Sequence, residues 1–382
     1  MKKLFLVSLI GLMSMTALLA QPSCVKDVWF TVQNGQIGKA KLQIDKCYAQ
    51  YPEDADVLLM RGNVYLRRHV QETSDLGKDP SYVVKDPNAI FIANESFYQS
   101  MQINPDAQPL NGFDAKKGQA ECAGELMNAG YQFFNDKKYP EAEKYLNAAL
   151  RSYKASSATA RMADIYYVLA LVKRQNGNET EFIENLKLAV AAKTTNSIVY
   201  EILYDATLKT GDTVSAFKYV TDGLRNIKAD SLKYDLSLKE INHYVLTHDT
   251  THINKSVTGF LEKYGETPQN VANVSQTLTN AGLFNQALDM LLKANEKYDN
   301  NKDIVKGLAY SYFFYAIQFQ DQMTAALATG STSKLPTLQA EQKKVQLEAY
   351  KWAKKAIELD PADQSSKTMV DQLKAVLGSA VE

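Results

Sequence analysis

The sequence carries no excess of charge of either sign. Its 382 residues include 43 lysine and arginine residues against 43 aspartate and glutamate residues. No basic stripe stands out, whereas proteins that bind nucleic acid or an anionic membrane surface concentrate positive charge. We therefore expect neither kind of partner.

Catalytic and cofactor-binding motifs are missing too. The chain has no phosphate-binding loop, dinucleotide fingerprint, nucleophile elbow or paired-cysteine metal motif. With 45% hydrophobic and 23% charged residues, it has the composition of a large folded protein. We expect a folded protein that is not an enzyme and needs no cofactor.

Long apolar runs are confined to the start of the sequence. Lys2 and Lys3 precede an apolar run at residues 4–12, and small residues at 17–20 follow it. This pattern predicts a secretory signal peptide at residues 1–20. No later stretch approaches the roughly 18 apolar residues of a membrane-spanning helix. We therefore predict no transmembrane segment, and an exported protein of the periplasm or cell surface of a Gram-negative bacterium.

Only three cysteines are present. Residues 21–23 do not match a lipoprotein signal, so we expect no lipid anchor on Cys24. Cys24 and Cys47 lie on either side of a turn signal at Gly35, so two antiparallel helices joined there would place both thiols at one level. Export permits their oxidation, and the pair forms either a disulfide or two buried thiols. Cys122 is expected to be a small buried residue.

What the sequence does contain is a recurring helix ending. The segments "KCYAQYPEDAD", "SMQINPDAQ" and "AIELDPADQ" each end a helical stretch with proline followed by acidic and small residues. An alanine lies twelve residues before each proline, at Ala40, Ala93 and Ala349. This self-similarity indicates an internal repeat.

With these features the chain resembles the tetratricopeptide repeat (TPR) family, whose unit is a helix hairpin of about 34 residues. Gly62 and Tyr65 stand at the family's places in the first helix of one unit, and Gly130 does so in the next. Ala142 and Leu146 fill the matching places of a second helix. The resemblance implies an all-α fold, a right-handed superhelical solenoid of about eight TPR-like hairpins with a capping helix at 367–377.

We divide the chain into N-terminal repeats at 21–154, degenerate repeats at 155–268 and C-terminal repeats with the capping helix at 269–382. In the degenerate part Phe182 and Ser256 stand where the family has a small residue. Extra residues at 68–88 and 324–339 are predicted to be loop insertions. The eight hairpins are predicted at 22–52, 55–106, 120–154, 158–193, 197–229, 233–266, 269–299 and 303–361.

The resemblance also implies a ligand-binding groove along the first helices of successive units. Tyrosine and arginine in such a groove suit a peptide or protein ligand, although each aromatic could instead pack between helices. The implied groove residues are Asn63, Met127, Tyr131, Phe134, Tyr167, Arg174, Glu201 and Asp205.

Three of the four histidines lie close together, at His243, His248 and His252. On a continuous helix the last two would face one metal ion. The polar residues between them instead predict a turn and a helix N-cap at Asp249 or Thr251. We therefore prefer the interpretation that these histidines do not form a metal site.

The sequence thus favours a non-enzymatic scaffold that binds a protein or peptide of unidentified nature. Two alternatives remain open. One is a carbohydrate-capture protein that uses groove aromatics, and the other is a metal-dependent enzyme built on the histidine cluster.

Overall fold

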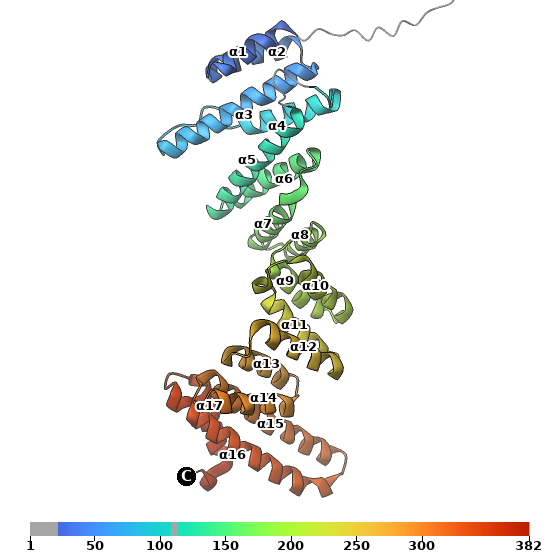
Figure 1. The fold of residues 1–382 in the computed structure, drawn as a ribbon, viewed down its shortest axis with the longest axis vertical. Helices are drawn as coiled ribbons and strands as arrows, with labels where there is room; N and C mark the ends of the chain where they lie inside the picture. The colour runs from blue at the N-terminus through green and yellow to red at the C-terminus, as the bar shows by residue number, and fades with distance from the viewer. Residues whose placement is uncertain (1–21, 108–113, 382) are drawn as a thin grey trace, which may run out of the picture. The chain divides into compact units, whose positions relative to one another are not determined.

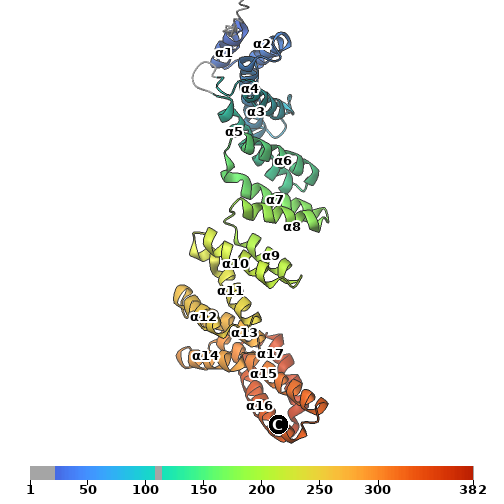
Figure 2. The same cartoon turned by 90° about the vertical axis from the view of Figure 1, so that its right-hand side faces the viewer.

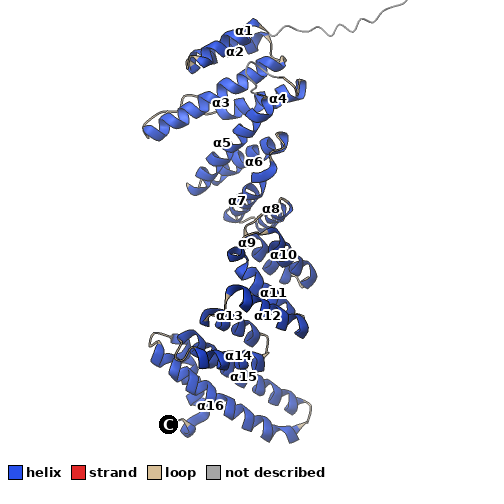
Figure 3. Cartoon of the chain, in the orientation of Figure 1, coloured by secondary structure: helices blue, strands red, loops and turns tan. Residues whose placement is uncertain are grey.

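The computed structural model describes residues 22–107 and 114–381, and throughout these residues the chain forms helices and no strand (Figure 3). The predicted signal peptide at 1–20 lies outside the described residues. The chain divides into two compact units, the first ending at Ala192 and the second beginning at Lys193. None of the described helices is both long and apolar enough to cross a membrane.

In its described residues, the first unit forms four helix hairpins in chain order (Figure 1). A short 3-10 turn, Thr159–Arg161, precedes the fourth. The hairpins are α1 (Ser23–Gln33) with α2 (Ile37–Gln50), α3 (Ala55–Lys78) with α4 (Ala89–Ile103), α5 (Ala115–Asn135) with α6 (Tyr139–Ala155), and α7 (Met162–Gln175) with α8 (Glu179–Ala191).

The second unit repeats this plan and adds a last helix that packs on α16. Its hairpins are α9 (Ser197–Leu208) with α10 (Thr213–Asn226), α11 (Tyr234–Leu246) with α12 (Thr250–Tyr264), α13 (Pro268–Asn280) with α14 (Phe284–Lys297), and α15 (Lys302–Ala328) with α16 (Leu335–Leu359), followed by α17 (Gln364–Leu377). The all-α array of eight hairpins and a closing helix is confirmed for the described residues. The handedness of the superhelix and the division at residues 154 and 268 stay predictions.

A single left-handed residue marks the turn inside most hairpins. Seven of the eight hairpins in the described part have one, with φ between 55° and 85°. Glycine adopts this conformation without steric cost, yet two of the turns use other residues, Lys137 and His248. The complete set is Gly35, Lys137, Gly177, Gly211, His248, Gly282 and Gly330.

The turn residue fixes which side chain of the second helix is buried. In six hairpins, the residue five places after the left-handed one is at most 2% exposed. In α12 this residue is Ile253, at 1% exposure, whereas Ser256 is only partly buried. The predicted place of Ser256 was therefore wrong by three residues. The six buried residues are Ala40, Ala142, Phe182, Ala216, Ile253 and Ala287.

Glycine inside the first helices allows close packing, as predicted for Gly62 and Gly130. A Cβ on Gly130 would lie 2.7 Å from the side chain of Leu146, and one on Gly62 would lie 2.5 Å from the ring of Phe97. Gly118 of α5 approaches the same ring equally closely. Because real Cβ atoms do not come so near, only glycine permits these helix contacts.

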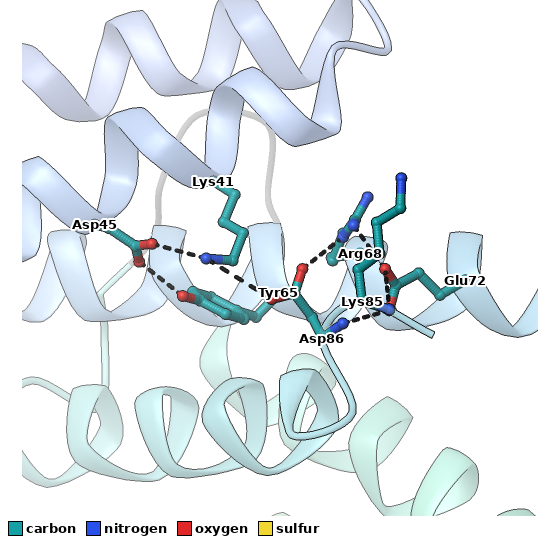
Figure 4. Close-up of polar contacts among 7 residues, drawn as sticks. All are labelled: Lys41, Asp45, Tyr65, Arg68, Glu72, Lys85 and Asp86. Atoms are coloured by element: carbon teal, nitrogen blue, oxygen red, sulfur yellow. Dashed lines mark hydrogen bonds and ion pairs between the residues drawn. The ribbon is translucent and has the colours of Figure 1, made fainter. Parts of the chain in front are cut away.

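The prediction that residues 68–88 form a loop insertion is wrong for its first half. Helix α3 continues to Lys78, and only the last ten residues form a loop. Figure 4 shows how that loop is held: the Glu72 carboxylate accepts the backbone N–H groups of Lys85 and Asp86 at 3.2 and 3.0 Å. Arg68 bridges the two carboxylates, with its guanidinium 2.6 Å from Glu72 and 2.8 Å from Asp86. The extra residues therefore form a longer helix with a folded-back segment.

The second insertion, at 324–339, is also mostly helical. Helices α15 and α16 lie side by side in Figures 1 and 2 and are 27 and 25 residues long. Only residues 329–334 connect them, and three of these form a 3-10 turn. The extra residues lengthen both helices of the hairpin, so the predicted loop is again wrong.

Candidate functional site

An open cavity of about 810 Å³ runs along one face of α3 in the first unit. One end is formed by the turn between α1 and α2, through Val32, Gly35 and Ile37, and Glu121 of α5 contributes an acidic group. The contributions of α3 recur every three or four residues, which is the spacing of a single helix face. They are Asn63, Leu66, Arg67, Val70, Gln71, Ser74, Asp75 and Lys78.

The length of α3 is what creates this cavity. Helix α3 has 24 residues against 15 in its partner α4, so its C-terminal turns extend beyond the rest of the hairpin. Leu66 is buried at 4% exposure, whereas Val70 is 47% exposed. The cavity therefore offers an accessible aliphatic side chain among polar and charged groups of both signs.

Asn63 is the predicted groove residue that lines this cavity. Its side chain is 2% exposed and its Oδ1 accepts a hydrogen bond of 2.8 Å from Nε of Arg67. This bond fixes the base of the Arg67 guanidinium at the cavity. Asn63 thus positions a charged neighbour rather than presenting a free amide.

The predicted residues of α5 lie mostly within the packing between helices. Met127 is 4% exposed, and Phe134 is partly buried against Tyr139 with ring centroids 6.0 Å apart. The hydroxyl of Tyr131 is buried without a hydrogen-bond partner among the described residues. Burial raises the pKa of Tyr131 to about 12, with the nearby Asp164 carboxylate adding to the shift. A role for these three residues in ligand contact stays a prediction.

The predicted residues of α7 differ in exposure. Tyr167 is partly buried, and Arg174 is exposed with its guanidinium 5.2 Å from the ring centroid of Phe182. Neither residue lines the cavity along α3. Their role as ligand contacts also stays a prediction.

Glu201 and Asp205 lie on α9, in the second unit. Burial raises the pKa of Glu201, and its Oε1 is buried without a partner among the described residues. Asp205 is exposed and accepts two bonds from Nζ of Lys239, at 2.7 and 2.9 Å. Its carboxylate is therefore already paired within the protein.

The three clustered histidines lie in and beside the turn between α11 and α12. His243 stacks on Phe217 with centroids 4.0 Å apart, and His248 is the left-handed turn residue. Asp249 caps α12, as one of the two predicted capping residues, by accepting the backbone N–H of His252 at 3.1 Å. No group of three potential metal ligands converges in the described part of the chain.

Cys24 and Cys47 are brought together as a disulfide that joins α1 to α2. Their Cα atoms lie 6.0 Å apart, within the range that disulfides span. Cys122 is fully buried, as its small apolar character suggested. That the pair is oxidised in the cell stays a prediction.

Sequence reasoning missed a second cavity of the first unit. This cavity, of about 900 Å³, is lined mainly by the second helices α4 and α6 rather than by first helices. The second unit has smaller cavities of about 580 Å³ between α12, α13 and α14, and about 350 Å³ between α13, α15 and α17. The 900 Å³ cavity of the first unit is lined by basic residues that lie far apart in the sequence, which is why no local motif predicts it.

Comparison with known proteins finds likeness only at the level of structure. No protein-family model matches the sequence, and no curated protein matches it. Solved structures similar to the chain include TPR proteins.

Three of these structures illustrate the degree of similarity. A tetratricopeptide repeat protein from Parabacteroides merdae is 16% identical, with 66% of this chain and 98% of that chain covered and a TM-score of 0.39. Yeast Tom70 is 14% identical over 92% of this chain and 81% of that chain, with a TM-score of 0.36. Pseudomonas aeruginosa PilF is 15% identical over 64% of this chain and 92% of that chain, with a TM-score of 0.29. Because the TM-scores are below 0.5, these likenesses carry no argument about partner or mechanism.

Proposed function

We propose that this protein is a non-enzymatic scaffold that holds an extended segment of a protein partner in the cavity along α3. The observation that carries the proposal is the continuous stripe of polar, charged and aliphatic side chains from Asn63 to Lys78. At the rise of an α-helix this stripe is about 22 Å long. An extended peptide of about seven residues has the same length.

The chemistry of the stripe suits a peptide. Val70 offers an exposed apolar contact, and Gln71 and Ser74 offer hydrogen-bond donors and acceptors for a peptide backbone. Arg67 and Asp75 provide charges of opposite sign at the cavity, which would select side chains of the partner. Rigid helices present all of these groups, so little ordering of the site is needed on binding.

The lining favours a peptide over a sugar. A carbohydrate-capture protein of the kind considered above would use aromatic rings, whereas the cavity is lined by aliphatic, amide and charged side chains. Tyr131, one of the predicted groove aromatics, is partly buried with its hydroxyl enclosed. We therefore retain the protein partner.

We also propose that the protein works outside the cytoplasm, in the envelope of a Gram-negative bacterium. The support is the basic and apolar pattern of residues 1–20 and the pairing of Cys24 with Cys47, which suits an oxidising compartment. No lipid anchor, cofactor or nucleic acid forms part of the proposal.

Photo-cross-linking tests binding in the cavity along α3 directly. A benzoylphenylalanine in place of Val70 would stand in the cavity at a side chain that is already exposed. The matched control carries the same group at Leu42, which is 65% exposed on α2 and outside the cavity. In cell-envelope fractions we expect one saturable adduct with the Val70 probe and none with the Leu42 probe.

The adduct must also map to one extended segment of the partner. A synthetic peptide of that segment should bind the purified protein and compete with cross-linking, and Gln71→Ala together with Ser74→Ala should weaken this binding. Equal adducts from both probe positions, or a mapped peptide that does not bind, would contradict the proposal.

A further inference from the structure

The cavity of about 900 Å³ in the first unit belongs to no site discussed so far. Tyr98 and Met101 of α4 form one side, and the end of α6 forms another. The first turns of α5 contribute Lys116 and Gln119. The full lining is Asn94, Glu95, Tyr98, Met101, Gln102, Pro105, Lys116, Gln119, Arg151, Lys154 and Ala155.

Positive charge dominates this cavity. Lys116, Arg151 and Lys154 face a single acidic residue, Glu95. All three basic side chains are exposed, and none of them forms an ion pair with another residue in the described ranges. The cavity therefore holds positive charge that no described residue neutralises through an ion pair, although the chain as a whole is neutral.

A buried amide forms part of the cavity wall. Gln119 is 2% exposed, and its Nε2 donates to Oδ1 of Asn94 at 2.6 Å. Ser152 donates to the same Asn94 oxygen, also at 2.6 Å. These bonds fix the orientation of the Gln119 amide. Its Oε1 is buried without a hydrogen-bond partner among the described residues.

Beside the amide, Tyr98 is 44% exposed and offers an aromatic surface. The cavity thus combines an exposed aromatic surface with three basic side chains that have no ion-pair partner among the described residues.

We propose that this cavity binds an acidic peptide segment of a protein partner. Carboxylates of the segment pair with Arg151, Lys154 and Lys116, and an apolar side chain packs on Tyr98. Charge complementarity identifies the class of segment. The exposed ring of Tyr98 among the basic groups suits a peptide, which can carry acidic and apolar side chains together. The site is independent of the cavity along α3.

Fluorescence anisotropy with a defined peptide tests this site. The probe is a labelled peptide of alternating glutamate and aspartate residues with one tyrosine and one leucine, and its counterpart replaces the acidic residues by glutamine and asparagine. We expect saturable binding of the acidic peptide to the purified protein, weakened by added salt, and no saturable binding of the neutral one.

Two double variants distinguish specific binding in the cavity from nonspecific electrostatic attraction to the protein surface. Arg151→Gln/Lys154→Gln removes two charges from the cavity, and Lys39→Gln/Lys46→Gln removes two exposed charges from α2. Both change the net charge equally. We expect the cavity variant to lose at least about tenfold in affinity, because charge-assisted hydrogen bonds are stronger than neutral ones, and the α2 variant to keep its affinity. Tyr98→Ala should also weaken binding.

Each contrary result overturns the proposal. Absence of saturable binding, equal loss in the two double variants, or equal binding of the neutral peptide would each exclude this site. Preference for an acidic polysaccharide such as polyuronate would exclude a peptide as its occupant. Loss of binding in Arg67→Gln alone would assign the acidic peptide to the cavity along α3 instead.

Discussion

The ring of Phe97 lies where a side chain on Gly62 would have to stand. A Cβ on Gly62 would come within 2.5 Å of two ring atoms, and Phe97 itself has no exposed surface. The end of the same ring meets Gly118 equally closely, through Cζ and the two Cε atoms. One large side chain of α4 is thus enclosed by two glycines of α3 and α5, and it sets how closely the second hairpin packs against the third.

This contact predicts that Gly62→Ala destabilises the protein. The fully buried ring has little room to move away from the added methyl group, because Gly118 of α5 also contacts it closely. Overpacking of this kind costs about 1–3 kcal/mol, which exceeds the gain of up to about 1 kcal/mol from replacing glycine inside a helix. Urea unfolding followed by circular dichroism measures the difference.

Gly77→Ala is the matched control for that experiment. Gly77 lies on the same helix, and a Cβ there would meet no atom within 4 Å. We expect this variant to be as stable as the wild type or more stable. Equal unfolding free energies for the Gly62 variant and the wild type would show that the α3–α4 contact is looser than described.

Glu72 is predicted to hold the segment between α3 and α4. Its carboxylate is 2% exposed, pairs with Arg68 and accepts two backbone N–H groups. Removing one partner of a buried pair costs about 3–5 kcal/mol, so Glu72→Ala should release this segment. Hydrogen exchange at the amides of Lys85 and Asp86 should become faster. Thr73→Ala, an exposed change on the same helix, should leave exchange unchanged.

The pairing of Cys24 with Cys47 predicts a specific alkylation pattern. Without reduction, the denatured protein should take up one alkyl group, at Cys122, and after reduction it should take up three. A disulfide spanning 23 residues should stabilise the first hairpin by about 3 kcal/mol. Cys24→Ser/Cys47→Ser should therefore lower the unfolding temperature of α1 and α2. Uptake of three groups without reduction would rule the disulfide out.

We predict that the folded protein loses stability in mild acid because of His243. Burial lowers the pKa of its imidazole from the ordinary 6.5, so the neutral ring is favoured in the folded state. The unfolded chain binds the proton at the ordinary pKa. The stabilising contribution is therefore complete above about pH 6.5 and declines as the pH falls toward the lowered pKa.

A phenylalanine at position 243 should remove this contribution to the pH dependence. It keeps the stacking on Phe217 without a titratable group. The neighbouring Tyr244, Glu240 and His252 are unchanged in both proteins, so their effects cancel in the comparison. Urea midpoints measured from about pH 7.5 to about pH 5 should decrease less in His243→Phe than in the wild type. Parallel decreases would assign the acid sensitivity to other groups.

The hairpins could be predicted from the sequence because their signals are local. The prolines after α2, α4 and α16 and the small residues Gly62 and Gly130 report packing that depends on only one neighbouring helix. The insertions were less predictable, because nothing in residues 68–78 distinguishes an exposed loop from extra turns of an exposed helix. Ser256 was misplaced because it was counted twelve residues back from Pro268, and this proline begins α13 instead of following directly on α12.

The candidate sites could be predicted only in part. Asn63 was found because its place in the repeat aligns with a groove position, whereas Tyr131 at a comparable place is enclosed by its neighbours. The basic cavity depends on Lys116 and Arg151, which lie 35 residues apart and meet only through the packing of α5 beside α6. Such juxtapositions depend on how helices cross, which the repeat pattern leaves unspecified.

The turns also show what the repeats have in common. Lys137 and His248 stand where other turns have glycine, and Phe182 and Ile253 stand where other second helices have alanine, yet in six described hairpins the buried side chain lies five residues after the turn. Among these hairpins the interval is therefore more constant than the residues that define it. A search for distant relatives of this chain would gain sensitivity by scoring that interval instead of the consensus amino acids.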